Sequence, residues 1–451
     1  MKLELKKPYD KRQILASASP DGNFYTFASD KNKAYCLRYN SALFFRDSLS
    51  MNVPDSDAFA AGSSFDSGGA YLYWQSQNHD KLWVTGFDFQ KRQSSKNAYT
   101  FSFEKETYLG SFSNDGIFYL LTVFDEEQKL KIRTFHNGNP QEQVVDLSNF
   151  EIIDRQDKKL KLFKLFEQSP LQIIAPGSFP SLTQTASATK LFYSKGQILF
   201  TFDMSPNFTQ VFSISTADFS VTETRFAQPS LTETDASSAN SFVIDSLLVQ
   251  IRVSSSELVL ESKKLEKNAS VLKQYRVETN QVVDFKNSPL LVQNGNRKPF
   301  ELSSTKKFLS RLDGSQPAVS AYATPQGILL NCGGVREIPG TGGIILGTIG
   351  LGVAITGNGS FDPDSLYDSK IPQVIYFESL FDANFAHSKK EQNAIAFDFL
   401  STFLSENESI VTYSLSLYNK AQILAYYDSR SKMIILRKFQ EESPEDNMFG
   451  N

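Results

Sequence analysis

The feature that most constrains the fold of this sequence is a turn signature that recurs at a fixed interval. It occurs at 17–25, 64–72 and 111–119. The glycines of these segments, Gly22, Gly69 and Gly116, are each 47 residues apart. Asp-Gly and Gly-Gly accept the positive φ angles of tight turns, and aromatic or apolar runs flank each turn, as they do in a hairpin. An interval of about 40 to 50 residues is typical of propeller blades. The interval therefore predicts a repeat protein built from small sheets.

Weaker copies of the pattern continue along the chain and bring the number of units to about seven. The predicted blades are 12–56, 57–106, 107–152, 186–232, 238–295, 308–382 and 393–439. Extra segments near 153–185 and 265–325 shift the phase of the repeat, and 440–451 is an acidic tail that we expect to be frayed. The sequence thus predicts an all-β chain, a β-propeller of about seven four-stranded blades forming a single domain over 1–439.

Composition agrees with a fold made of strands. Aromatic residues make up 13% of the chain, mostly 38 Phe and 18 Tyr, and such residues are enriched in sheets. The best helix candidate is 390–404, where Ala394, Phe397 and Leu400 fall close to helical spacing. We therefore expect at most one or two short helices and a helix content below about a fifth.

One turn also indicates a family. Ser19-Pro20-Asp21-Gly22 resembles the blade turn of TolB-like and related WD-type propellers, and Ser113-Asn114-Asp115-Gly116 is similar to it. This resemblance implies a propeller that is used mainly for binding.

The aromatic residues that follow the recurring turns share one offset. Phe24, Tyr71 and Phe118 each stand two residues after the aligned glycine. We therefore expect these three side chains to occupy equivalent, largely buried strand positions.

Charge and cysteine usage exclude two classes of protein. The net charge is −4 with both signs mixed along the chain, so the basic field that would attract a nucleic acid is missing. Cys36 and Cys332 are the only cysteines and stand far apart within apolar runs, which excludes a disulfide framework. Residues 1–10 are charged and lack the apolar core of a signal peptide, which predicts a cytoplasmic protein; removal of a leader would leave a periplasmic or cell-envelope location open.

The sequence contains none of the strong catalytic or cofactor motifs. A Gly-x-Ser-x-Gly elbow, a phosphate-binding loop and a His-Glu-x-x-His helix are all missing, so we predict no cofactor. His79, His136 and His387 show no metal-ligand spacing and are interpreted as turn or surface residues. Carboxylate pairs in a propeller hydrolase come from different blades, so sequence spacing selects no pair here.

A Gly-rich apolar insert over 340–370 interrupts the repeat. Its apolar residues are Ile344, Ile345, Leu346, Ile349 and Leu351. The uncharged stretch is shorter than the roughly 20 residues of a spanning helix. We predict that it projects as a hairpin or loop and contacts a partner or a membrane; the alternative is that it covers a blade face or plugs the channel.

Three carboxylates follow this stretch. Asp362, Asp364 and Asp368 offer oxygen ligands and form a weak calcium candidate, because Asp362 and Asp364 alternate as in a calcium loop although the glycine and terminal glutamate of that loop are missing. The alternative is a solvated acidic turn.

These observations lead to one main hypothesis and two alternatives. The main hypothesis is a non-catalytic propeller that acts as a protein-interaction scaffold or as a subunit of a larger assembly. The first alternative is a propeller hydrolase or lyase with its site in the central channel. The second is an envelope-associated component that contacts a partner or membrane through the insert at 341–358.

Overall fold

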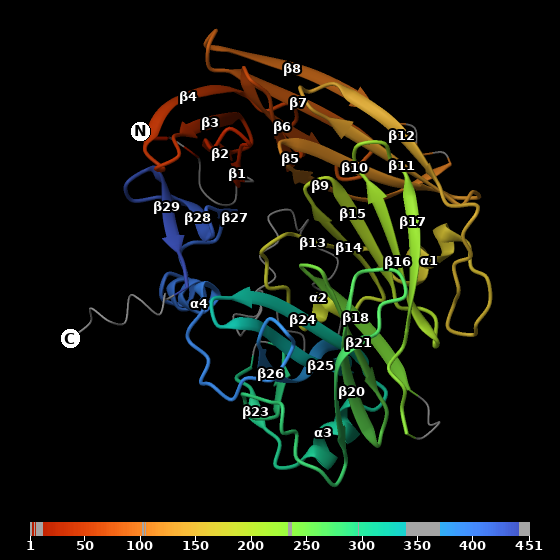
Figure 1. Cartoon of the computed structure of the whole chain (residues 1–451). Helices are drawn as coiled ribbons and strands as arrows, with labels where there is room; N and C mark the ends of the chain where they lie inside the picture. The colour runs from red at the N-terminus through yellow and green to blue at the C-terminus, as the bar shows by residue number, and fades with distance from the viewer. Residues whose placement is uncertain are drawn as a thin grey trace.

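Seven sheets follow one another around a ring in the computed structural model (Figure 1). The structure describes residues 2–3, 5, 12–101, 103, 105–232, 237–295, 297–339 and 370–441, without the side chains of residues 339 and 370. The ring begins with the first sheet, drawn in red, and returns to it with the last sheet, drawn in blue. The predicted all-β propeller is confirmed, and we call the sheets blades 1 to 7 in chain order.

The strands of each blade are consecutive in the chain. Blade 1 contains β1 (Gln13–Ala18), β2 (Phe24–Ser29), β3 (Lys33–Tyr39) and β4 (Phe45–Asn52). Blade 2 contains β5 (Phe59–Phe65), β6 (Gly69–Gln75), β7 (Lys81–Asp88) and β8 (Gln93–Thr100). Blade 3 contains β9 (Glu106–Asn114), β10 (Ile117–Phe124), β11 (Lys129–Phe135) and β12 (Pro140–Asp146). Blade 4 contains β13 (Gln172–Ile174), β14 (Thr189–Ser194), β15 (Gln197–Phe202), β16 (Phe208–Ser215) and β17 (Val221–Ala227).

The second half of the ring is less regular. Blade 5 contains β18 (Ser238–Ile244), β19 (Leu247–Val253), β20 (Glu257–Lys264) and β21 (Val271–Glu278). Blade 6 contains β22 (Leu291–Asn294), β23 (Phe300–Glu301), β24 (Gln316–Thr324), β25 (Gly327–Pro339) and β26 (Lys370–Phe381). Blade 7 contains β27 (Tyr413–Tyr418), β28 (Ala421–Asp428) and β29 (Met433–Phe439).

Helices are short and lie in the connections. Strands account for 53% of the residues and helices for 8%, so the expected low helix content is confirmed. The described residues contain four helices rather than one or two: α1 (Leu162–Gln168), α2 (Leu182–Thr185), α3 (Thr305–Leu312) and α4 (Ala396–Glu406). Ser181 and Ser304 accept hydrogen bonds from backbone N–H groups at the starts of α2 and α3, a capping signal that the sequence already contains. The helix predicted over 390–404 is α4, which begins at Ala396.

The middle strands are apolar on both faces because each blade packs between two others. Strand β2 is buried at every position. Phe24 lies 5.3 Å from Tyr418 of blade 7, measured between ring centroids, and Phe27 lies 6.1 Å from Phe87 of blade 2. Outer strands differ, since β8 is exposed at nearly every position. A continuous apolar run therefore marks a middle strand.

Side chains close the edges of the inner strands. The N–H of Ala16 donates to Ser414 Oγ of blade 7 at 2.9 Å, and the N–H of Ser63 donates to Ser113 Oγ of blade 3 at 2.8 Å. Gln13 Nε2 of blade 1 donates to the carbonyl of Ala58, just before blade 2, at 2.9 Å. Buried backbone groups need such partners, so these bonds hold blades 7, 1, 2 and 3 in fixed positions.

A buried ion pair connects blades 4 and 5. The fully buried Lys190 Nζ lies 3.1 Å from Asp203 Oδ2 and donates to Asn240 Oδ1 of blade 5 at 2.7 Å. Asp203 also accepts from the N–H and the hydroxyl of Ser241. Burial lowers the pKa of Lys190, whereas the charge of Asp203 and its hydrogen bond raise it. A charge in such a site is tolerated because the surrounding groups satisfy its hydrogen bonds.

Residues from the start of the chain complete blade 7 and close the ring. The N–H of Leu3 donates to the carbonyl of Lys432 at 2.6 Å, and Tyr427 Oη donates to the carbonyl of Leu3 at 2.7 Å. The side chains of Leu3 and Leu5 are buried in a cluster with residues of blades 1 and 7, including Phe24. The first and last parts of the chain therefore share one core.

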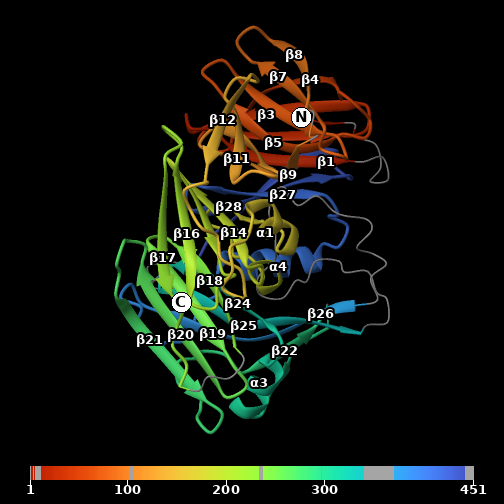
Figure 2. The same cartoon turned by 90° about the vertical axis from the view of Figure 1, so that its right-hand side faces the viewer.

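Blade 6 carries the predicted insert between two of its strands. Pro339 of β25 pairs with Lys370 of β26, and the residues between them lie outside the described part of the chain. Figure 2 shows the ring from the side, with β26 reaching toward the right of the view. The apolar residues Ile344, Ile345, Leu346, Ile349 and Leu351, the calcium candidates Asp362, Asp364 and Asp368, and residues 442–451 of the tail all lie outside the described residues.

The predicted equivalence of three aromatic residues is right for two of them. Phe24 and Phe118 are fully buried and face the preceding blade; Phe118 stacks on Tyr73 of blade 2 at 4.3 Å. Tyr71 is half-buried and packs toward the following blade, whereas Ala70 faces blade 1. The glycine alignment is therefore one residue out of register in blade 2, and a shift of one residue turns every side chain to the other face.

We expect Phe118→Ala to lower the free energy of unfolding by about 3–5 kcal/mol, because it leaves a cavity in a filled core. Tyr71→Ala should cost about 1–2 kcal/mol, as at a half-buried site. Urea denaturation followed by fluorescence measures both. Equal losses in the two variants would contradict this assignment of faces.

We also expect Leu3→Ala to cost about 2–5 kcal/mol, because this leucine is buried in the core that closes the ring. The exposed Leu272 of β21 provides the control, and Leu272→Ala should change stability by less than about 0.5 kcal/mol. A Leu3 variant with the denaturation midpoint of the control would show that the start of the chain is not required for closure.

Candidate functional site

A segment at the start of blade 4, before β14, crosses the central channel. Residues 172–186, named here the channel segment, include β13 and α2, and Figure 1 shows both inside the ring. Phe179 packs against Tyr322 of blade 6 at 5.5 Å, and Ser320 Oγ of the same blade donates to the carbonyl of Pro180 at 2.6 Å. Gln422 Nε2 of blade 7 donates to the carbonyl of Gly177 at 2.9 Å. The segment thus spans the channel from blade 4 to blades 6 and 7.

Gly177 makes this crossing possible. Its φ is +65°, a conformation that favours glycine, and a Cβ atom at this position would lie 2.5 Å from Leu417 Cδ2. The sequence predicts only an extra segment near 153–185. Residues that do not follow the blade period give no indication of where they pack.

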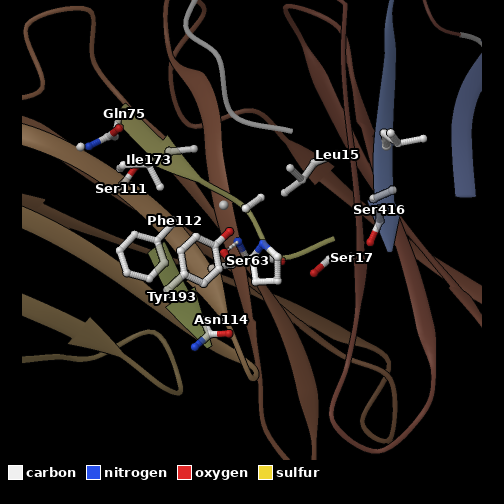
Figure 3. A pocket seen from close by; sticks show the side chains of 18 of the residues that line it. Leu15, Ser17, Ser63, Gln75, Ser111, Phe112, Asn114, Ile173, Tyr193 and Ser416 are labelled. Carbon is white, nitrogen blue, oxygen red and sulfur yellow. Dashed lines mark hydrogen bonds between the residues drawn. The ribbon is translucent and has the colours of Figure 1, made fainter. Parts of the chain in front are cut away.

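The part of the channel that remains open forms a cavity of about 610 Å³. Most of its wall comes from the inner strands of blades 1, 2, 3 and 7 and from the channel segment. Gln75 and His79 of blade 2 and Tyr193 of blade 4 add to it. Figure 3 shows Ser17, Ser63, Ser111, Asn114 and Ser416 around it. The wall is therefore rich in hydroxyl and amide groups.

One part of the cavity wall combines aromatic rings with hydrogen-bonding groups. The His79 ring stacks on Tyr108 at 4.0 Å between centroids, and Phe59 approaches His79 edge-on at 5.6 Å. Tyr108 Oη lies 3.2 Å from Gln75 Oε1 and 3.1 Å from Ser111 Oγ. Burial lowers the pKa of His79, so this part of the wall is uncharged at neutral pH.

A second part of the wall holds the single carboxylate among the described residues that line the cavity. This residue, Asp115, lies 3.7 Å from Lys195 Nζ. Nearby, Asn114 Nδ2 donates to the carbonyl of Ser194 at 2.8 Å, and Phe112 stacks on Tyr193 at 4.3 Å. Lysine and arginine are missing from the described lining.

Four buried polar atoms of lining residues have no hydrogen-bond partner within the described part of the chain. They are Ser63 Oγ, Gln75 Nε2, His79 Nδ1 and Gln184 Oε1. Buried polar atoms are nearly always paired, and these four are exceptions; each is enclosed by the protein and does not face the open part of the cavity.

The histidines differ in role. The sequence predicts a turn or surface position for His79; its backbone does close a turn, at φ 58°, but its ring forms part of the cavity wall. Only the tertiary structure brings it against Tyr108, a residue of the next blade. His136 is exposed, and His387 Nε2 lies 3.0 Å from Asn287 Oδ1. Within the described ranges, no three His, Cys, Asp or Glu residues are grouped to bind a metal ion.

Comparisons with known proteins do not assign the chain to a family. No protein-family model matches the chain, and no curated protein matches it significantly. Among solved structures, the WD40 domain of SCAP from fission yeast is 12% identical, with 96% of this chain and 85% of that one covered and a TM-score of 0.31. Hsv2 of Kluyveromyces lactis is 7% identical, with 96% and 99% covered and a TM-score of 0.32. A prolyl endopeptidase is 8% identical at a TM-score of 0.32, and the match covers 93% of this chain but 47% of that one, so the chain spans about half its length. The assignment to the β-propellers rests on the seven sheets.

None of the helices in the described part of the chain has the length and apolar character needed to cross a membrane.

A buried carboxyl group outside the cavity has a strongly shifted pKa. Glu378 of β26 lies opposite Asn331 of β25, and its Oε1 has no hydrogen-bond partner among the described residues. Burial, and secondarily the charge of Asp398, raise the pKa of Glu378 to about 7. The folded state therefore holds this proton more tightly than the unfolded chain does.

We expect this group to make the protein less stable as the pH rises from about 4.5 to 7, because the folded state must release its proton in that window. Glu378→Gln should reduce this pH dependence and stabilise the protein above pH 7 by up to a few kcal/mol, at about 1.4 kcal/mol per pKa unit. Thermal unfolding across this pH range, with the exposed Glu408→Gln as control, tests the expectation. A wild-type pH profile in Glu378→Gln would contradict it.

Proposed function

We propose that this chain is a single-domain, non-catalytic β-propeller that binds a partner protein at its channel face, as a scaffold or as a subunit of a larger assembly. The observation that supports this proposal is the cavity itself. Four blades and the channel segment present hydroxyl, amide and aromatic groups there, and a rigid frame with such groups is suited to recognition.

The chemistry of the wall favours binding over hydrolysis. A propeller glycosidase needs two convergent carboxyl groups, one to protonate the leaving group and one to act as base or nucleophile. Asp115 is the one carboxylate in the described wall, and Lys195 is its neighbour. His79 stacks on Tyr108, whose hydrogen-bonding neighbours, Gln75 and Ser111, are neutral.

Rigidity of the wall also supports recognition. The inner strands that carry Ser17 and Ser63 are bonded to the next blades through side chains. The partly exposed Leu417, next to Gly177, adds an apolar contact at the edge of the same cavity. A partner that fits this face would meet groups that do not need to be ordered on binding.

A pair of matched substitutions tests the proposal. Ser416→Arg places a large cation in the cavity wall, whereas Ser94→Arg makes the same change on the exposed outer strand β8. We expect a stoichiometric partner to co-purify from native extract with wild type and with Ser94→Arg, and to fall at least roughly tenfold with Ser416→Arg, because an unpaired charge in the contact is costly. Quantitative mass spectrometry of the captured proteins provides the measurement. Failure of wild type to retain any stoichiometric partner, or equal capture by both variants, would count against the proposal.

A further inference from the structure

Another hollow lies where blades 4, 5 and 6 meet, and it differs from the channel cavity in charge. This hollow, named here the arginine pocket, has a volume of about 190 Å³ and shares no lining residue with the channel cavity. Its wall includes the loop between β15 and β16, the starts of β18 and β24, and two arginines, Arg155 and Arg252. An adjoining hollow of about 280 Å³ shares Arg155, Met204 and Gln316 with it.

Arg252 brings a positive charge to this wall without a direct counter-ion. Among the described residues, its guanidinium donates to two neutral groups, from Nε to Ser237 Oγ at 3.1 Å and from Nη1 to the carbonyl of Pro229 at 3.0 Å. Burial lowers the pKa of Arg252, while the charge of Glu257 raises it. Glu257 itself forms its ion pair with Arg276. A half-buried guanidinium in this situation would be stabilised by an anion.

Arg155 adds a second positive charge at the same pocket. Its side chain is exposed and makes no ion pair with any residue that the structure describes. Asp203 is the one carboxylate in the described wall, and it is already engaged. Its Oδ2 lies 3.1 Å from Lys190 Nζ and accepts from Ser241 Oγ, and its Oδ1 accepts from Thr209 Oγ1. The charges of Asp203 and Lys190 cancel, so the two arginine charges remain uncompensated.

Two uncompensated guanidinium groups favour a ligand with two negative charges. A guanidinium presents its N–H donors in a planar fork that matches the oxygens of phosphate and carboxylate groups. A phosphate monoester carries about −1.5 to −2 charges at pH 7, whereas a carboxylate carries one. The exposed side chains of Ser238 and Gln316 on the same wall add neutral donors. A phosphate monoester therefore fits the pocket better than a carboxylate does.

The volumes indicate how such a ligand would lie. Sites for whole small molecules usually measure about 300–1,000 Å³, so the arginine pocket is suited to one group of a ligand. The adjoining hollow, whose wall also carries Gln156 and Gln168, is suited to a polar remainder. We propose that the arginine pocket binds the phosphate group of a phosphate monoester and that the adjoining hollow contacts the rest of the molecule. This site is separate from the channel cavity and does not rest on the proposed function.

Calorimetry and thermal unfolding of the full chain test the proposal. The probes are inorganic phosphate and glycerol 3-phosphate, with glycerol and chloride as controls at the same ionic strength. We expect both phosphates to bind and to raise the melting temperature, because a ligand that binds only the folded state stabilises it. Glycerol and chloride should do neither.

A vesicle experiment distinguishes two sources of the same phosphate chemistry. Co-sedimentation with phosphatidylcholine vesicles that contain phosphatidate, and not with phosphatidylcholine alone, would assign the phosphate to a lipid headgroup. Binding of glycerol 3-phosphate without co-sedimentation would assign it to a soluble molecule. Either result supports the site.

Variants locate the site. Arg155→Gln removes an exposed charge and should weaken phosphate binding roughly tenfold or more, the effect of one hydrogen bond to a charged group. Arg252→Lys keeps the charge but loses the fork, and should weaken binding roughly three- to tenfold. Arg46→Gln is the matched control, because Arg46 is exposed on β4 and lies outside both linings. Its phosphate affinity should equal that of wild type.

Several results would overturn the inference: none of the phosphate probes binds, glycerol binds as tightly as glycerol 3-phosphate, or Arg155→Gln binds phosphate like Arg46→Gln. If Arg252→Lys melts below wild type without ligand, the exposed Arg155 decides the test. Ser416→Arg should bind phosphate like wild type, because Ser416 belongs to the channel cavity alone. Loss of partner capture in that variant therefore tests the proposed function separately.

Discussion

The structure depends on the requirement that every blade be covered on both faces. The middle strand β2 is buried at each position because Phe24 packs toward blade 7 and Phe27 toward blade 2. An open array of such sheets would leave two apolar faces in water. Closure of the ring removes both faces from water. Leu3 and Leu5 are buried in the core that blades 1 and 7 share where the ring closes. Cooperative stability therefore depends on contacts between residues at opposite ends of the chain.

Closure of the ring creates a channel, and the channel segment determines what the channel can hold. By packing Phe179 against blade 6 and bonding Gly177 to blade 7, the segment fills part of the space and leaves a cavity beside blades 1, 2 and 3. Inner-strand hydrogen bonds fix the wall. The backbone that carries the wall is therefore held in place, which favours a preorganised site.

Part of this architecture was predictable because blades repeat. The turn at Asp115-Gly116 and the apolar run of β10 follow rules of local geometry, and they placed Phe118 correctly in the core. The same rule misplaced Tyr71, because Gly68 and Gly69 give two possible alignments and the faces of a strand alternate with every residue. The additional helices were missed because segments of four to eight residues, such as α2 and α3, are stabilised by tertiary packing more than by their own periodicity.

The sequence by itself determined the class of fold, a number of sheets of about seven and a net charge of −4, because turn chemistry, strand periodicity and charge are local or additive properties. Only the tertiary structure decided which polar residues line one cavity. Ser63, Gln75, His79 and Gln184 come from blade 2 and from a segment outside the repeat, and nothing in their spacing indicates that they share one cavity. Their meeting follows from the curvature of the ring and from the path of the channel segment across it, and both are set by packing between residues far apart in the chain.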